Sequence, residues 1–258
     1  MASSSRPSGV ASAGGGCPLR LEIRSKRFGA VEALRGLTLS AAAGEVVALV
    51  GPSGCGKTTA LGIAAGLDRD FDGVVAVGPG PGGGSAKLGY VFQEPRLLPW
   101  RSVRRNLALV LPRPLRRGPA VDSMLDALEL SAVADRFPTQ LSLGMARRVA
   151  LARAFLVEPD LLLMDEPFVS LDEATALRLR ALLSRLLDRR PATVLLVTHN
   201  LREALALADR LLVLAPSPGR VVAEVPVTLP RAARDDGAIE ALRRELLARP
   251  EPAFRLLA

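Results

Sequence analysis

The chain has 258 residues, 49% of them apolar, and a formal net charge of +8 at neutral pH. This length fits one large domain or a domain with a subdomain, and no apolar run approaches the ~18 residues that a membrane span needs. Lysine occurs only at Lys26, Lys57 and Lys87, and the arginines form no block along the chain. With few aromatic residues beside them, these charges do not indicate a nucleic-acid-binding protein.

The first residues are rich in serine, alanine and glycine and contain no apolar segment of the kind found in secretory signals. We therefore expect residues 1–17 to form a disordered tail. The two cysteines, Cys17 and Cys55, do not suggest a disulfide framework, and a reduced cytosolic compartment fits them best.

Strands and helices are expected to alternate along the rest of the chain, which is typical of an α/β protein. After Glu94, prolines interrupt short helical patterns, and no strand pattern returns before Asp160. The expected strands are residues 19–24, 34–39, 46–50, 74–77, 88–93, 161–164, 193–198, 211–214 and 221–227, and the expected helices are residues 59–66, 103–111, 120–130, 173–188 and 239–248.

A phosphate-binding loop follows the third of these strands. The segment Gly51-Pro52-Ser53-Gly54-Cys55-Gly56-Lys57-Thr58-Thr59 matches the pattern G-x-x-x-x-G-K-[ST]. A buried strand before it and a helix after it direct backbone N–H groups at one anion, which suits a triphosphate. We expect Lys57 to reach the β- and γ-phosphates and Thr58 to ligate Mg²⁺. We also expect Cys55 to react with alkylating reagents unless Mg·ATP protects it.

Two carboxylates, Asp165 and Glu166, follow the apolar strand at residues 161–164. The carboxyl end of a strand is where ligands bind in an open α/β sheet. We expect Asp165 to hold Mg²⁺ while Glu166 orients and deprotonates a water. A carboxylate pair after a strand often only caps a helix, and the phosphate loop favours the catalytic interpretation.

His199 is the only histidine, and it also follows a predicted central strand. A single histidine is more often structural than catalytic. At the same sheet edge as the other motifs, however, its imidazole could hydrogen-bond a γ-phosphate and stabilise charge in the transition state.

In this order the motifs resemble those of the nucleotide-binding subunit of an ABC transporter, from about residue 19 to residue 227. The resemblance identifies Gly51–Thr59 as the Walker A motif and residues 161–166 as the Walker B motif. It further assigns Gln93 to the Q-loop, residues 170–172 to the D-loop and His199 to the switch histidine, and Phe28 is similar to the aromatic that stacks on adenine.

The segment Leu141-Ser142-Leu143-Gly144-Met145 resembles the LSGGQ signature of this family. Leu143 replaces the first glycine and Met145 the glutamine, whereas Ser142 and Gly144 are kept. In the family two chains enclose two ATP molecules, each held by one Walker A motif and the opposite signature. The larger side chain of Leu143 would lie at the interface between the two chains, where it would oppose tight closure of the dimer.

The resemblance implies an α/β fold of the P-loop NTPase (ABC ATPase) class, with a RecA-like core, a small antiparallel β subdomain and an inserted helical subdomain. It implies Glu166, His199 and Gln93 as catalytic residues and Thr58, Gln93 and Asp165 as Mg²⁺ ligands. ATP would also contact Phe28, Ser142, Gly144 and Asp172. The implied domains are residues 1–17 (tail), 18–93 (first part of the core, with the β subdomain), 94–159 (helical subdomain), 160–229 (second part of the core) and 230–258 (C-terminal helical appendage).

Residues 93–100, Q-E-P-R-L-L-P-W, resemble importer subunits of the nitrate, sulfonate and taurine type, and residues 165–168 and 198–204 point the same way. The resemblance implies an ATPase bound peripherally at the cytoplasmic face of the inner membrane. Its partners would be a second copy of itself, membrane permease subunits, whose coupling helix Trp100 would help to receive, and indirectly an extracytoplasmic solute-binding protein. No nucleic-acid partner is expected.

Three alternatives remain open from the sequence. The chain could be a soluble ABC-type ATPase that acts on nucleic acid or the ribosome, although such proteins usually carry two cassettes or a long coiled coil. It could import another small solute, such as a thiamine precursor. It could also be a regulatory protein with a dead site, against which Lys57, Asp165, Glu166 and His199 argue.

Overall fold

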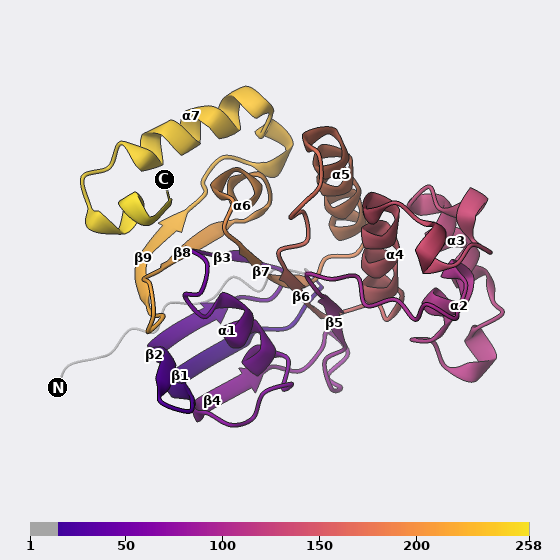
Figure 1. The fold of residues 1–258 in the computed structure, drawn as a ribbon, viewed down its shortest axis with the longest axis horizontal. Coiled ribbons are helices and arrows are strands. Elements are labelled where there is room, and N and C mark those ends of the chain that lie inside the picture. Colours follow the sequence, from indigo (N-terminus) through magenta and orange to yellow (C-terminus); the bar gives the residue numbers. More distant parts are fainter. Residues whose placement is uncertain (1–14, 258) are drawn as a thin grey trace.

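The computed structural model describes residues 15–257, which form two β-sheets and the helices packed on them (Figure 1). An antiparallel sheet of three strands has the order β2-β1-β4, and a sheet of six strands has the order β5-β6-β7-β3-β8-β9. In the larger sheet all neighbouring strands pair in parallel except β8 and β9. The strands are β1 (Leu19–Phe28), β2 (Val31–Ala41), β3 (Val46–Val50), β4 (Asp72–Val77), β5 (Leu88–Val91), β6 (Leu161–Asp165), β7 (Thr193–Thr198), β8 (Arg210–Leu214) and β9 (Val221–Pro226).

The larger sheet is buried on both faces because its central strands are apolar without interruption. One set of alternating side chains packs against α4 (Leu143–Leu156), α5 (Glu173–Arg189) and α6 (Leu201–Leu207). The other set packs against α1 (Lys57–Ala64) and the antiparallel sheet. This layered arrangement is the α/β architecture that the sequence predicts.

The register of the parallel strands brings their carboxyl ends to one edge of the sheet. Val50 of β3 lies opposite Thr198 of β7, and Asp165 of β6 lies opposite Val197. The chain therefore leaves β3, β6 and β7 at nearly the same level, and the segments that follow these strands meet there.

Between Val91 and Leu161 the described chain forms helices and no strand. α2 (Val103–Ala108), α3 (Pro119–Ala127) and α4 lie together at one end of the molecule (Figure 1). The buried side chain of Asn106 ties the preceding loop to α2, since it donates to the carbonyls of Leu98 and Arg101 at 3.2 and 2.9 Å.

The C-terminal segment is part of the main core. α7 (Asp236–Leu247) lies against α6, and its residues Asp236 and Glu240 form ion pairs with Arg202. Apolar side chains of this segment, among them Ile239 and Phe254, are buried with those of the larger sheet. Figure 1 shows this segment, in yellow, beside α6 and β9.

The structure corrects the predicted extent of the tail. The predicted disorder of residues 1–14 lies outside the described residues, but Cys17 is fully buried and its N–H donates to the carbonyl of Asp160 at 3.3 Å. Cys17 directly precedes β1 and packs in the same apolar layer, so the chain is ordered two residues before that strand begins.

None of the helices formed by residues 15–257 combines the length and the apolar character needed to cross a membrane.

Candidate functional site

The phosphate-binding loop occupies residues 51–56, between β3 and α1. Gly56 has a left-handed backbone, with φ of 92°, and a Cβ atom there would lie 2.4 Å from Cδ2 of Leu34. A larger residue here would need a left-handed backbone and would displace the Leu34 side chain, so both conformation and space favour glycine.

The loop provides donors for an anion. Within residues 15–257, no hydrogen bond uses the backbone N–H groups of Gly54, Gly56 or Thr58. Such unpaired N–H groups at a helix start attract phosphate. The buried ammonium group of Lys57 lies beside them and donates to the carbonyls of Gly51 and Pro52 at 2.9 and 2.8 Å. These residues fit a nucleotide phosphate chain.

Cys55 does not behave as the sequence suggests. Its side chain is 1% exposed and lies 3.9 Å from the Lys57 ammonium group. Burial raises the pKa of the thiol above its usual value, although the nearby charge of Lys57 opposes the shift. This burial disfavours the expected alkylation of Cys55 in the folded chain, because the thiol packs in the apolar core.

Thr58 and Asp165 meet across the sheet edge, and the hydroxyl of Thr58 donates to Asp165 Oδ1 at 3.0 Å. Asp165 is 3% exposed, and burial raises its pKa; the hydrogen bond from Thr58 lowers it, and the charge of Glu166 raises it further. A hydroxyl and a carboxylate with such geometry are oxygen donors of the kind that Mg²⁺ prefers.

Glu166 faces His199, with 3.0 Å between Glu166 Oε2 and His199 Nδ1. The pair forms a hydrogen bond when the imidazole carries its proton on Nδ1. Glu166 has a left-handed backbone, with φ of 44°, which costs of order 1–3 kcal/mol in a non-glycine residue. The carboxylate of Glu166, whose backbone is strained, and the imidazole of His199 therefore form one hydrogen-bonding unit.

Arg147, on α4, holds this strained turn, and the sequence patterns did not single it out. Its buried guanidinium donates to the carbonyls of Glu166 and Pro167 at 3.1 and 2.8 Å. The local sequence around Arg147 gives no indication of this role, because Arg147 and the carbonyls that it contacts are far apart in the chain.

Gln93 lies just beyond β5 and lines a cavity of about 460 Å³ together with Thr58 and Asp165. Phe28 ends β1 and is 53% exposed. It pairs with Val31 at the tip of the β1–β2 hairpin, whose second strand reaches the phosphate loop through Leu34.

Ser142, Gly144 and Asp172 lie together, but apart from the phosphate loop. They line a second pocket, of about 600 Å³, to which no residue of the loop contributes. Ser142 caps the N-terminus of α4 by accepting from the N–H of Met145 at 3.2 Å, and Asp172 caps α5. Leu143 is 43% exposed beside them. Within one chain, the predicted site residues thus form two groups.

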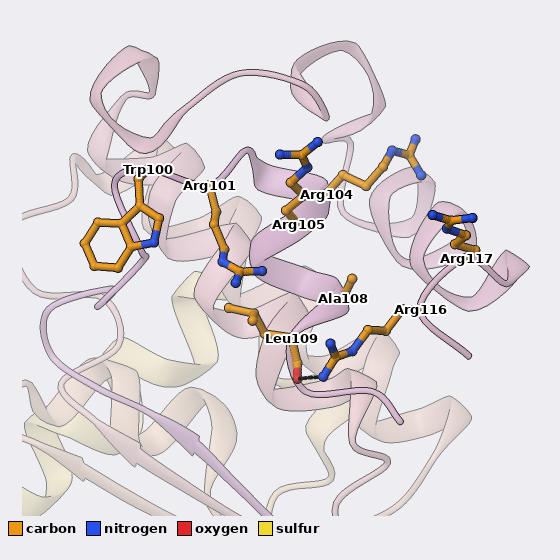
Figure 2. A pocket seen from close by; sticks show the side chains of 8 residues that line it. All are labelled: Trp100, Arg101, Arg104, Arg105, Ala108, Leu109, Arg116 and Arg117. Atoms are coloured by element: carbon orange, nitrogen blue, oxygen red, sulfur yellow. Dashed lines mark hydrogen bonds between the residues drawn. The ribbon is translucent and has the colours of Figure 1, made fainter. Parts of the chain in front are cut away.

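A third hollow, of about 590 Å³, lies on α2 and contains Trp100, which is 69% exposed (Figure 2). Arg104 pairs with Asp122, but within residues 15–257 no carboxylate forms an ion pair with Arg101, Arg105 or Arg117. In Figure 2 the guanidinium groups surround the hollow from several sides. The surface is therefore strongly cationic and carries one exposed aromatic side chain.

Comparisons with known proteins agree with this arrangement. Residues 34–169 match the sequence profile of the ABC transporter family. The chain is 46% identical, over 231 residues, to an aliphatic sulfonates import ATP-binding protein of Burkholderia cenocepacia, with 89% of this chain and 86% of that protein covered. A protein of the same description from Pseudomonas aeruginosa is 45% identical over 245 residues, with 92% and 97% covered.

Two solved structures are similar over 82% of this chain and all of theirs, each with a TM-score of 0.70. One is a dimeric post-hydrolysis state of an ATP-binding cassette bound to ADP and Pi, at 28% identity. The other is a dimeric bacterial ABC transporter cassette, at 29% identity.

The burial of Cys17 and Cys55 predicts that the native protein has no fast-reacting thiol. Burial raises the pKa of both thiols, so the reactive thiolate is scarcer at a given pH than in a free cysteine. Titration with a chromogenic disulfide should detect two thiols in guanidinium chloride and none at a free-cysteine rate in buffer. A Cys17→Ser variant isolates Cys55, and rapid native labelling of that variant would contradict the structure.

Proposed function

The chain belongs to the ABC transporter family, and from this premise we propose that it hydrolyses ATP as the energy-coupling subunit of a bacterial importer of a small solute. The observation that carries the proposal is the meeting of Lys57, Thr58, Asp165, Glu166 and His199 at one edge of the larger sheet.

ATP binds with its phosphates on the loop, where Lys57 exchanges its two carbonyl partners for phosphate oxygens. Gly51, Gly54 and Gly56 let the backbone approach the phosphates, and the adenine stacks on the exposed face of Phe28. Thr58, Asp165 and Gln93 would hold Mg²⁺, which would supply positive charge beside the phosphates.

Glu166 orients the attacking water and accepts its proton, and the reaction releases ADP and phosphate without a covalent intermediate. His199 keeps the Glu166 side chain in place through Nδ1 and, as an imidazolium with a proton on each ring nitrogen, donates from Nε2 to the γ-phosphate, so that charge in the transition state is stabilised.

A second copy of the chain completes the site. Ser142 and Gly144 begin α4 on a surface separate from the phosphate loop, so within one chain they do not reach the same nucleotide. In a two-fold dimer they face the γ-phosphate bound by the partner, with Asp172 beside the seam.

Permease subunits dock in the hollow around Trp100, which places the chain at the cytoplasmic face of the inner membrane. Arginine forks pair well with carboxylates, and Arg101, Arg105 and Arg117 lack such partners within residues 15–257. The docking segment of the permease is therefore acidic, and an extracytoplasmic binding protein delivers the solute to the permease.

The solute is an aliphatic sulfonate or a related small anion. The relatives from Burkholderia cenocepacia and Pseudomonas aeruginosa, which match nearly their whole length, carry names that refer to aliphatic sulfonates. The proposal is tested by deleting the gene in its source organism and measuring uptake of a labelled alkanesulfonate; unchanged uptake contradicts this solute class.

Replacing Glu166 by glutamine should lower the rate of ATP hydrolysis at least ~10²-fold, because the amide cannot accept a proton from water. ATP affinity should persist, since Lys57 and the loop are unaltered. Phosphate release and calorimetric titration with ATP measure the two quantities. Glu158→Gln is the matched control, because Glu158 is exposed and, among residues 15–257, forms ion pairs only with Lys87 and Arg190. Unchanged turnover in Glu166→Gln would remove this residue from catalysis.

Replacing Arg101, Arg105 and Arg117 together by glutamine should reduce recovery of an integral membrane subunit roughly tenfold when the tagged chain is purified from mild-detergent extracts. ATP hydrolysis by the isolated chain should not change. The control with equal charge is Arg20, Arg69 and Arg244 replaced by glutamine, which alters other surfaces. Equal recovery by both triple variants contradicts docking in the hollow, and recovery of ribosomes or DNA without a permease contradicts the importer.

A further inference from the structure

Lys26 is a charged residue that the catalytic scheme does not use. It lies in β1, its side chain is 2% exposed, and its ammonium group lies 4.5 Å from the centre of the Phe28 ring. A cation at this distance is attracted to the electron-rich face of an aromatic ring. The buried ammonium group therefore fixes one face of Phe28.

The ammonium group is itself held in place by the loop between α1 and β4. Lys26 Nζ donates to a carboxylate oxygen of Asp68 at 3.0 Å and to the carbonyl and carboxylate of Asp70. Burial opposes the charge of Lys26, but the hydrogen bonds and charges of the two aspartates outweigh it and raise its pKa. The residue stays cationic at neutral pH, because only the charged form satisfies these acceptors.

The other face of Phe28 is open, since the side chain is 53% exposed. Val31, opposite Phe28, is three residues from Leu34, which contacts Gly56 of the phosphate loop. At about 3.3 Å per residue, this spacing is roughly 10 Å along the strand. The open face thus lies within reach of a base whose phosphates occupy the loop.

We propose that Lys26 is a positioning residue that holds the Phe28 ring for adenine, with the ammonium group on one face and the base on the other. Through Asp68 and Asp70, which follow α1, the same lysine joins the base platform to the helix that begins at the phosphates. This inference rests on the proposed contact between Phe28 and adenine.

The test compares Lys26→Met with the unmodified chain. Because the methionine keeps the bulk and removes the charge, the KM for ATP should rise about threefold to tenfold while kcat is kept. Inhibition by inorganic tripolyphosphate, which has no base, should not change. Lys26→Arg should restore the KM, since a guanidinium also lies well against an aromatic face.

The double variant Lys26→Met, Phe28→Ala shows whether the lysine acts through the ring. If it does, Lys26→Met adds nothing to the KM of Phe28→Ala. Asp68→Asn weakens the support of the ammonium group without removing it and should give a smaller rise of the same kind, so that the inference is testable even if Lys26→Met folds poorly.

These experiments distinguish failure of the Phe28–adenine contact from failure of the role proposed for Lys26. An unchanged KM in Phe28→Ala contradicts adenine stacking itself. A raised KM in Phe28→Ala with a normal KM in both Lys26→Met and Asp68→Asn overturns the role of Lys26 alone. Independent effects in the double variant, or equal weakening of ATP and tripolyphosphate, assign the lysine to general stability instead.

Discussion

The parallel register of β6, β7 and β3 is the constraint on which the site depends. Because side chains alternate along a strand, a shift of one residue would turn Asp165 to the other face of the sheet and move Glu166 away from His199. The register is held by uninterrupted apolar side chains buried on both faces, and truncating a single leucine there would cost about 2–5 kcal/mol. The 3.0 Å contacts of Thr58 with Asp165 and of Glu166 with His199 follow from that packing.

A second constraint joins the two groups of site residues. Ser142, in the signature segment, caps the N-terminus of α4, and the same helix carries Arg147, which donates to the carbonyls of Glu166 and Pro167. Arg147 is buried, and its Nε atom has no hydrogen-bond partner within residues 15–257. An unpaired buried donor is costly, and so is the left-handed backbone of Glu166. Strain is therefore concentrated where α4, the helix proposed to face a partner chain, meets the residue proposed to activate water.

The sequence predicts the strands well, because central strands are continuous apolar runs and edge strands alternate. It also predicts the phosphate loop and the carboxylates, because each lies directly after such a run. Neither α4 nor the seven-residue helix α6 is among the helices expected from local patterns, since a helix buried on most sides and a very short helix both show little periodicity. Local sequence patterns could not predict the contacts of Lys26 and Arg147 or the burial of the Cys55 thiol, because the residues that surround these side chains come from distant segments of the chain. The structure shows where the site residues lie, whereas their catalytic and binding roles, those of Glu166, His199 and Gln93 included, stay predictions.

The central claim is that each catalytic site is shared between two copies of the chain. It is tested most directly by the ATPase rate of a 1:1 mixture of two inactive variants, Lys57→Ala and Gly144→Val. In a mixed dimer one site has an intact phosphate loop from one chain and an intact signature from the other. The account predicts recovery of up to about a quarter of the unmodified rate, since half of the dimers are mixed and each has one intact site. A mixture no more active than its separate components would contradict a shared site.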